Sequence, residues 1–316
     1  MSLPAERPVH CLSFDVEEHF QVSAFWAESR RQQWDRLESR VEANTRKIAE
    51  LLANQGVKAT FFILGWVAER HPEMVKSLVA QGHEVASHGY GHELVTTQSP
   101  ERFRQDVRMA KAILEDLTGN SIVGYRAPSF SITAATEWAL SILIEEGYRY
   151  DSSIYDRFTR AGKAKRFGGM FEIKTLAGNI WEVPPSTFKA FGVQLPVAGG
   201  GYFRLFPYSV SRALLQRLEA QGATLVMYLH PWEIDPSQPR MEGTRLSKFR
   251  HYLNLHKTQD RLNSLLVDFQ FDSIQKALAP IAGVVFNHAS GACVYNDSPV
   301  ANRCIDSCPP SSIPAR

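Results

Sequence analysis

Short apolar segments alternate with segments of helical periodicity along most of this 316-residue chain. Two of them, residues 57–64 (VKATFFIL) and 224–229 (TLVMYL), lack the polar residue at every second position that a half-exposed strand shows. Strands buried on both faces have this character, and they occur in parallel sheets covered by helices. The chain is therefore expected to be an α/β protein, with either an open doubly wound sheet or a (β/α) barrel.

Helix start and stop signals divide the chain into elements. Ser99 and Pro100 have the form of an N-cap followed by proline at the first helical position. Gly56, Gly82 and Gly147 each follow a predicted helix and mark its end. The expected strands are residues 9–14, 57–64, 83–87, 122–125, 148–150 and 224–229, and the expected helices are 41–52, 72–80, 100–117, 133–146, 207–220, 258–267 and 273–279.

Charge and hydropathy exclude some partners. The chain has 35 basic and 33 acidic residues, a net charge of +2, so no nucleic-acid partner is expected. Its apolar runs are too short for a membrane span, and no membrane insertion is expected. The N-terminal sequence MSLPAERP lacks the pattern of a secretory signal, which predicts a cytoplasmic protein. The oligomeric state is left open.

Five ionisable residues follow five different predicted strands. They are Asp15, His88, Arg126, Asp151 and His230. Charged residues often end strands, so one of them alone would mean little. Because the carboxyl ends of parallel strands meet at one edge, five groups of complementary chemistry predict an active site there.

A metal site is one interpretation of this edge. His88 and His92 are four residues apart, a spacing that can bring two imidazoles to one cation. Two positions apart in an extended chain, Asp15 and Glu17 point the same way, so one carboxylate can bind metal while the other takes a proton. Surface histidines and an acidic N-cap cluster are the ordinary alternatives for these two segments.

Other residues have candidate roles in catalysis or substrate binding. His230 is a candidate general acid, with a core imidazole as the alternative. Arg126 is expected to pair with Asp15 and keep it ionised, and Asp151 to orient His230 or Arg126. The candidate substrate-binding residues are Tyr90, Pro128 and Trp232.

Four motifs, in this order, resemble the polysaccharide deacetylases of carbohydrate esterase family 4, also called the NodB-homology family. They are Ser13-Phe14-Asp15-Val16-Glu17, His88 to His92, Arg126-Ala127-Pro128 and Tyr228-Leu229-His230. The sequences FDVEEHF, GGGYFRLFPY, HPWE and residues 245–271 look like the branch associated with exopolysaccharide and exosortase gene clusters, which carries a C-terminal extension.

The resemblance implies a distorted (β/α) barrel with its active site at the carboxyl ends of the strands. It implies a divalent metal, usually Zn²⁺, and hydrolysis of N-acetyl groups on the amino sugars of a glycan, here in exopolysaccharide biosynthesis. By alignment, Glu17, His88 and His92 are the metal ligands, Asp15 the base and His230 the acid. The commonest family pattern has two adjacent aspartates, whereas Val16 stands in the second place here.

The expected division is a deacetylase domain at 1–240, a C-terminal extension packed on it at 241–281, and a poorly ordered tail at 282–316. Two other functions stay open. One is an allantoinase-like hydrolase of small amides, which the Asp-x-Glu form allows. The other is a metal-free carbohydrate-binding pseudoenzyme, which Glu17 in place of an aspartate would favour.

Overall fold

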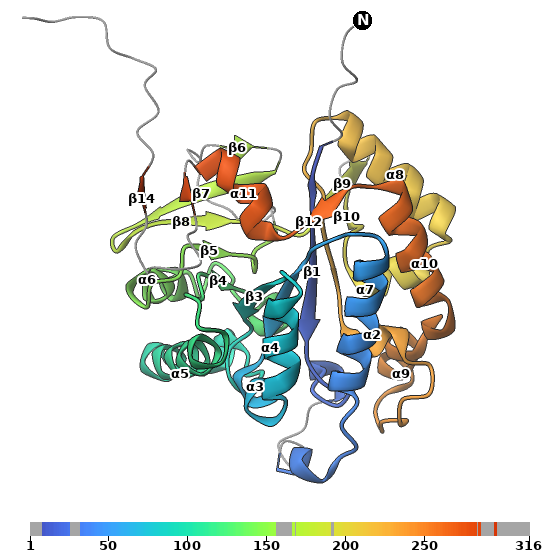
Figure 1. Cartoon of the computed structure of the whole chain (residues 1–316), viewed down its shortest axis with the longest axis horizontal. Coiled ribbons are helices and arrows are strands. Elements are labelled where there is room, and N and C mark those ends of the chain that lie inside the picture. Colours follow the sequence, from blue (N-terminus) through green and yellow to red (C-terminus); the bar gives the residue numbers. More distant parts are fainter. Residues whose placement is uncertain are drawn as a thin grey trace, which may run out of the picture.

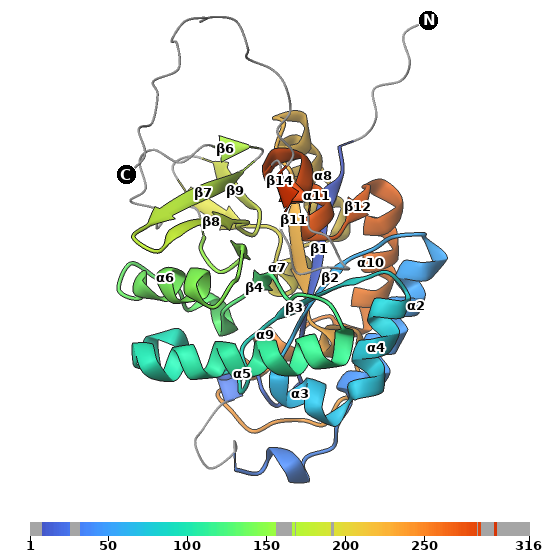
Figure 2. The same ribbon diagram turned by 60° about the vertical axis from the view of Figure 1, so that its left-hand side comes forward.

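The computed structural model describes residues 8–25, 32–155, 166–167, 169–190, 193–282, 284–285 and 294–295. The predicted tail, residues 282–316, lies almost wholly outside the described residues. A ten-stranded sheet in the order β11-β1-β2-β3-β4-β5-β8-β7-β6, with β12 beside β1, forms the centre of the fold. Figures 1 and 2 show this sheet curling around β1 with helices outside it.

Parallel strands make up one continuous part of the sheet. They are β11 (Val226–Leu229), β1 (His10–Val16), β2 (Thr60–Ile63), β3 (Glu84–Ser87), β4 (Gly124–Tyr125), β5 (Tyr150–Asp151), β8 (Gly178–Glu182) and β12 (Phe271–Asp272). The remaining pairings are antiparallel and join β8 to β7 (Met170–Thr175) and β7 to β6 (Arg166–Phe167). The predicted α/β fold with a curled, partly closed barrel is confirmed, and the antiparallel edge makes the sheet mixed.

Two small two-stranded sheets stand apart from the main sheet. One is formed by β9 (Thr187–Ala190) and β10 (Val193–Pro196), the other by β13 (Val284–Val285) and β14 (Val294–Tyr295). The first begins soon after β8 and leads into the helices of the second half of the chain.

The helices cover the outside of the curled sheet. In Figure 1, α3 to α6 lie to the left of β1, and α7 to α10 lie to its right. Their bounds are α2 (Val41–Asn54), α3 (Gly65–Arg70), α4 (Pro72–Ala80), α5 (Pro100–Thr118), α6 (Trp138–Glu145), α7 (Gly200–Leu205), α8 (Tyr208–Ala220), α9 (Arg245–Tyr252), α10 (Leu255–Asp268) and α11 (Ile274–Ala282). Short 3₁₀ helices are η1 (Ser23–Phe25), η2 (Trp34–Arg36), η3 (Val95–Thr97), η4 (Pro128–Phe130) and η6 (Pro231–Ile234). No helix among the described residues is long and apolar enough to cross a membrane.

Local signals account for most element boundaries. Helix α5 begins where Ser99 caps it through a hydrogen bond from the Arg102 amide and ends at Gly119, which has a φ of 65°. The sequence predicts that helix α6 begins at residue 133, but in the structure it begins at Trp138. The hydroxyl of Thr136 accepts a hydrogen bond from the Thr133 amide, and such side-chain bonds compete with helical ones.

The segment after residue 240 is bound to the rest of the molecule. Strand β12 pairs with β1, and Arg261 of α10 donates to the Phe203 carbonyl of α7. The Tyr208 hydroxyl of α8 donates to Asp268 at 2.6 Å. The division into a domain at 1–240 and an extension at 241–281 stays a prediction.

We expect Gly124→Ala to destabilise the fold. A β-carbon at position 124 would overlap the phenol ring of Tyr150, which is fully buried and donates to Glu84. Overpacking of this kind costs about 1–3 kcal/mol, measured here as the free energy of unfolding in urea. Gly201→Ala is the control, because a β-carbon there meets nothing within 4 Å. Equal stability of the two variants would contradict the predicted overlap.

Candidate active site

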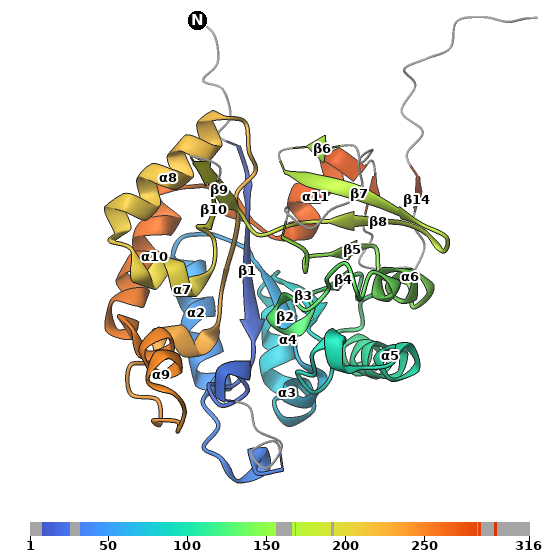
Figure 3. The ribbon, with the colours of Figure 1, turned by 180° about the vertical axis from the view of Figure 1, so that it is seen from behind.

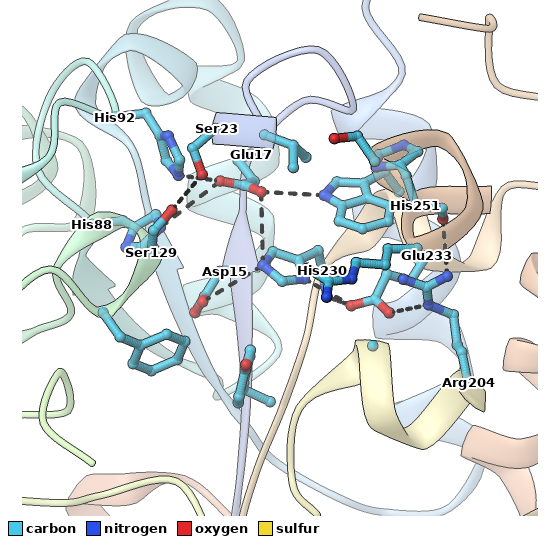
Figure 4. A pocket seen from close by; sticks show the side chains of 17 residues that line it. Asp15, Glu17, Ser23, His88, His92, Ser129, Arg204, His230, Glu233 and His251 are labelled. Atoms are coloured by element: carbon cyan, nitrogen blue, oxygen red, sulfur yellow. Dashed lines mark hydrogen bonds and ion pairs between the residues drawn. The ribbon is translucent and has the colours of Figure 1, made fainter. Parts of the chain in front are cut away.

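A cavity of about 300 Å³ opens at the carboxyl ends of β1, β3 and β11 (Figure 4). This is the edge at which the sequence predicts an active site, and Figure 3 shows it from behind, where β1 ends in its arrowhead. Six of the predicted site residues line the cavity: Asp15, Glu17, His88, His92, His230 and Trp232. Arg126 lies buried beneath them, and Tyr90, Pro128 and Asp151 are not among the lining residues.

Glu17, His88 and His92 bring one ligand atom each to a common point. The three atoms lie within 4.8 Å of one another, and all three residues are buried. Oε2 of Glu17 lies 2.6 Å from Nε2 of His92 and 4.0 Å from Nε2 of His88, yet it accepts no well-aligned hydrogen bond. A carboxylate oxygen and two imidazole nitrogens are a donor set that suits a divalent cation such as Zn²⁺, so these residues fit the implied metal.

The ring of His88 is held by a hydrogen bond at Nδ1, which leaves Nε2 to face the cavity. Nδ1 lies 2.8 Å from the Arg126 carbonyl oxygen, which can only accept, so Nδ1 carries the hydrogen. Burial lowers the pKa of His88 to about 4, so its ring is neutral near pH 7. Nε2 therefore presents a lone pair to the cavity, and the carbonyl fixes the ring as outer partners do at metal sites.

The loop that carries both histidines is held by the start of α3. The amides of Gly65 and Trp66 donate to the carbonyls of Gly89 and Tyr90, at 2.9 and 3.0 Å. His92 has a φ of 52°, which is uncommon outside glycine and is typical of residues constrained at functional sites. The Tyr90 hydroxyl donates to Glu69, away from the cavity, so the structure does not place this ring against a substrate.

Asp15 has one oxygen held and one facing the cavity. Arg126 donates to Oδ1 at 2.7 Å from below, and Nε2 of His230 lies 3.9 Å from Oδ2. The guanidinium of Arg126 is fully buried and also donates to Ser13 and to both oxygens of Ser152. The second oxygen of Asp15 is thereby left available for a proton.

His230 is oriented by Glu233, which stands three residues later on η6. Oε1 of Glu233 lies 2.7 Å from Nδ1 of His230, and its other oxygen accepts from Nε of Arg204 at 2.6 Å. Burial alone would lower the pKa of His230, but the charges of Glu17, Glu233 and Asp15 raise it to about 9. The ring is therefore an imidazolium near pH 7, with Nε2 directed into the cavity (Figure 4).

Trp232 has a different place from the one predicted. Its ring is stacked between the imidazoles of His230 and His251, at 5.0 and 4.2 Å between centroids, and is 5% exposed. Both faces are thus covered, which leaves no face for a sugar. Its indole N–H donates to Oε1 of Glu17 at 3.2 Å, so this side chain holds the carboxylate that faces the two histidines.

Asp151 is paired with a second carboxyl group. It lies opposite Glu182 in the β5–β8 register and accepts a hydrogen bond from Ser153. His230 and Arg126 find their carboxylates in Glu233 and Asp15 instead. Burial raises the pKa of Asp151 to about 6, and burial together with the charge of Asp151 raises that of Glu182 well above its usual range.

Several lining residues are absent from the predicted set. Glu233 and Arg204 orient His230, and the aromatic rings of Phe130 and Tyr228, 4.8 Å apart, form part of the wall. Pro128 is buried at the start of η4, while the next two residues, Ser129 and Phe130, line the cavity. The spacing of His230 and Glu233 in HPWE could have indicated that the two side chains meet, because three residues are one turn of a 3₁₀ helix.

Comparison with known families agrees with this geometry. Residues 32–150 match the family described as "Polysaccharide deacetylase". Residues 152–279 match a family described only as a domain of unknown function, DUF3473. The predicted resemblance to the NodB-homology polysaccharide deacetylases is therefore confirmed, and the family match lies in residues 32–150.

Known relatives match part of the chain. It is 34% identical over 110 residues to the peptidoglycan deacetylase-like protein FGM2 of Gibberella zeae, covering 34% of this chain and 32% of that protein. It is 29% identical over 113 residues to a peptidoglycan deacetylase of Helicobacter pylori, covering 36% and 38%. The chain thus matches about a third of the length of these relatives.

One solved structure shows the same fold over nearly the whole chain. It is a protein of Mycobacterium smegmatis assigned to the polysaccharide deacetylases, with a TM-score of 0.59 and 20% sequence identity. The match covers 89% of this chain and 93% of that one.

We expect Trp232→Phe to weaken metal binding. The substitution keeps an aromatic ring between the two imidazoles but removes the N–H that holds Glu17. Loss of such an outer hydrogen bond costs roughly tenfold or more in metal affinity. Competition with a chromophoric chelator measures this, with Trp138→Phe, remote from the cavity, as the control. An unchanged Zn²⁺ affinity would show that the indole does not position Glu17.

We expect Glu182→Gln to flatten the dependence of stability on pH. Because both carboxyls have raised folded-state pKa values, their contribution to stability is full below about pH 4 and is lost as the pH rises through about 6 and beyond. Between pH 5 and pH 8, the free energy of unfolding in urea should fall more in the wild type than in the variant. An equal fall in the two proteins would mean that the pair is not protonated as described.

Proposed function

We propose that this protein is a metal-dependent hydrolase that removes N-acetyl groups from the amino sugars of a poly- or oligosaccharide. The supporting observation is a single cavity that holds the Glu17–His88–His92 cluster, the free oxygen of Asp15 and the imidazolium of His230. The family match of residues 32–150 and the names of the deacetylase relatives support the same activity. We further propose Zn²⁺ as the metal and exopolysaccharide biosynthesis as the setting, on the basis of the sequence resemblance.

Metal binding in this proposal falls to Glu17, His88 and His92. A divalent cation there supplies Lewis-acid chemistry and makes nearby water more acidic. The neutral ring of His88 and the depressed pKa of Glu17 keep both groups in the deprotonated form that a metal requires. Burial alone would raise the pKa of Glu17, and its interactions with the rings of His92 and His230 outweigh burial.

Asp15 is the proposed general base. Arg126 donates to Oδ1 and fixes it, so Oδ2 is the oxygen that accepts a proton from the attacking water. Its distance of 3.9 Å from Nε2 of His230 leaves both groups facing the same space without a direct hydrogen bond. Both groups can therefore reach the same acetamide group.

His230 is the proposed general acid. An amine leaves poorly as an anion, so the nitrogen must gain a proton as the carbon–nitrogen bond breaks. His230 carries that proton on Nε2, because Nδ1 is committed to Glu233. Glu233 and Arg204 keep the ring in this orientation, as a carboxylate does behind many catalytic histidines.

Two substitutions separate metal binding from proton transfer. We expect His88→Ala to lose bound Zn²⁺ and turnover together, because it removes a ligand. Asp15→Asn should keep the metal and lower acetate release from N-acetylglucosamine oligomers by roughly 100- to 10,000-fold. The measurements are elemental analysis and an acetate assay on purified protein. Retained deacetylation in Asp15→Asn would contradict the assignment of the base.

The same measurements test the alternative functions. Purified protein that takes up no metal even after reconstitution would support a carbohydrate-binding pseudoenzyme instead. Turnover of ureides without acetate release from glycans would support an allantoinase-like hydrolase. Either result would replace the proposed function.

A further inference from the structure

Helix α9 forms one side of the cavity, the side on which Figure 4 shows His251. Ser247 and Arg250 of this helix also line the cavity. They are three residues apart, so they lie on one face of the helix. Neither residue has a role in the proposed chemistry, which takes place around Glu17 and His230.

Both side chains have donor capacity that the protein does not use. Arg250 makes no hydrogen bond or ion pair with any residue in the described part of the chain. The Ser247 hydroxyl accepts from Thr244 Oγ1 at 2.9 Å, and its own hydrogen has no acceptor among the described residues. Arg250 and Ser247, one helical turn apart, thus both line the cavity, and the exposed side chain of Arg250 has no partner among the described residues.

The other cations near the cavity are already neutralised. Arg204 is bound to Glu233 and to the carbonyls of His251 and Leu253. Arg126 is bound to Asp15. Helix α9 itself has the sequence RLSKFRHY, with no acidic residue to compete for Arg250. Among the described lining residues, Arg250 is therefore the cation that is free to meet a charged ligand.

We propose that Arg250 and Ser247 form a subsite for an anionic group on the sugar unit next to the N-acetylated amino sugar. This inference rests on the proposed deacetylase function and narrows its substrate to acidic glycans, such as those containing uronic acids. The planar fork of arginine matches the two oxygens of a carboxylate, and the serine hydroxyl adds a third donor. A cavity of about 300 Å³ is at the small end of ligand sites, which suits recognition of a short stretch of sugar.

The subsite also sets the direction in which the glycan enters. At the chemical end of the cavity Asp15 is paired with Arg126 and His230 with Glu233, so these charges are matched within the protein. Arg250 has no such partner among the described residues and is left for a charge on the ligand. The acidic unit then lies against α9 and the acetamido group against Glu17 and His230.

The test compares three acetylated substrates on the Zn²⁺-loaded protein. They are a tetrasaccharide of alternating N-acetylglucosamine and glucuronic acid, the neutral tetrasaccharide of N-acetylglucosamine, and UDP-N-acetylglucosamine, whose anion is a diphosphate. We expect Arg250→Ala to lower kcat/KM for the acidic tetrasaccharide about tenfold more than for the neutral one, mainly through KM. For Arg250→Lys, kcat/KM for the acidic tetrasaccharide should lie between the values of the wild type and Arg250→Ala, because lysine keeps the charge but lacks the planar guanidinium. An Arg250 effect seen with UDP-N-acetylglucosamine and not with the glucuronate substrate would assign the subsite to phosphate and overturn the acidic-glycan proposal.

Lys248→Ala is the matched control. Lys248 is exposed on the same helix and carries the same charge, but it does not line the cavity. We expect it to leave the ratio of acidic to neutral kcat/KM unchanged. An equal fall of this ratio in Lys248→Ala and Arg250→Ala would indicate non-specific attraction by the positive charge of α9 and would overturn the subsite. An unchanged ratio in Arg250→Ala would also overturn it.

Calorimetric binding of the two tetrasaccharides separates this inference from the proposed function. If the wild type binds the acidic tetrasaccharide more tightly and Arg250→Ala removes that preference, the subsite is supported even where no acetate is released. Absence of a preference in the wild type overturns the subsite, even if both tetrasaccharides are deacetylated.

Discussion

The buried guanidinium of Arg126 is the group on which the arrangement of the site depends. It lies 4.1 Å from the Phe62 ring centroid, beneath the cavity, and joins β1 to the chain after β5 through Ser13, Asp15 and Ser152. A buried charge is costly unless it is paired and fully hydrogen-bonded. Arg126 is paired with Asp15 and makes three further hydrogen bonds, to Ser13 and to both oxygens of Ser152, so it fixes one oxygen of Asp15 and leaves the other to the cavity.

Four consecutive residues, 230–233, serve both halves of the site. His230 is directed by Glu233, and Glu233 by Arg204. Trp232, between them, donates a hydrogen bond to Glu17 and holds the carboxylate that faces His88 and His92. A change in η6 would thus disturb the proposed acid and the proposed metal ligands together.

The fold and the membership of the site were largely predictable from the sequence, because both follow from local patterns. Continuous apolar runs identified the parallel strands, and the polar residues that end β1, β3 and β11 line one cavity. Strand β8 and helix α9 were not predicted, since their short segments carry no clear periodicity. Trp232 and Asp151 were assigned partners that the structure does not give them, because a residue's neighbours across the sheet are not written in its own segment.

The sequence by itself determined which elements form and which chemical groups stand at the ends of the strands. Both depend on the order of residues within a few positions of one another. Only the tertiary structure decided which group each side chain meets. Trp232 and Glu17 are 215 positions apart, and their hydrogen bond exists because β11 and β1 pair in parallel and end at the same edge.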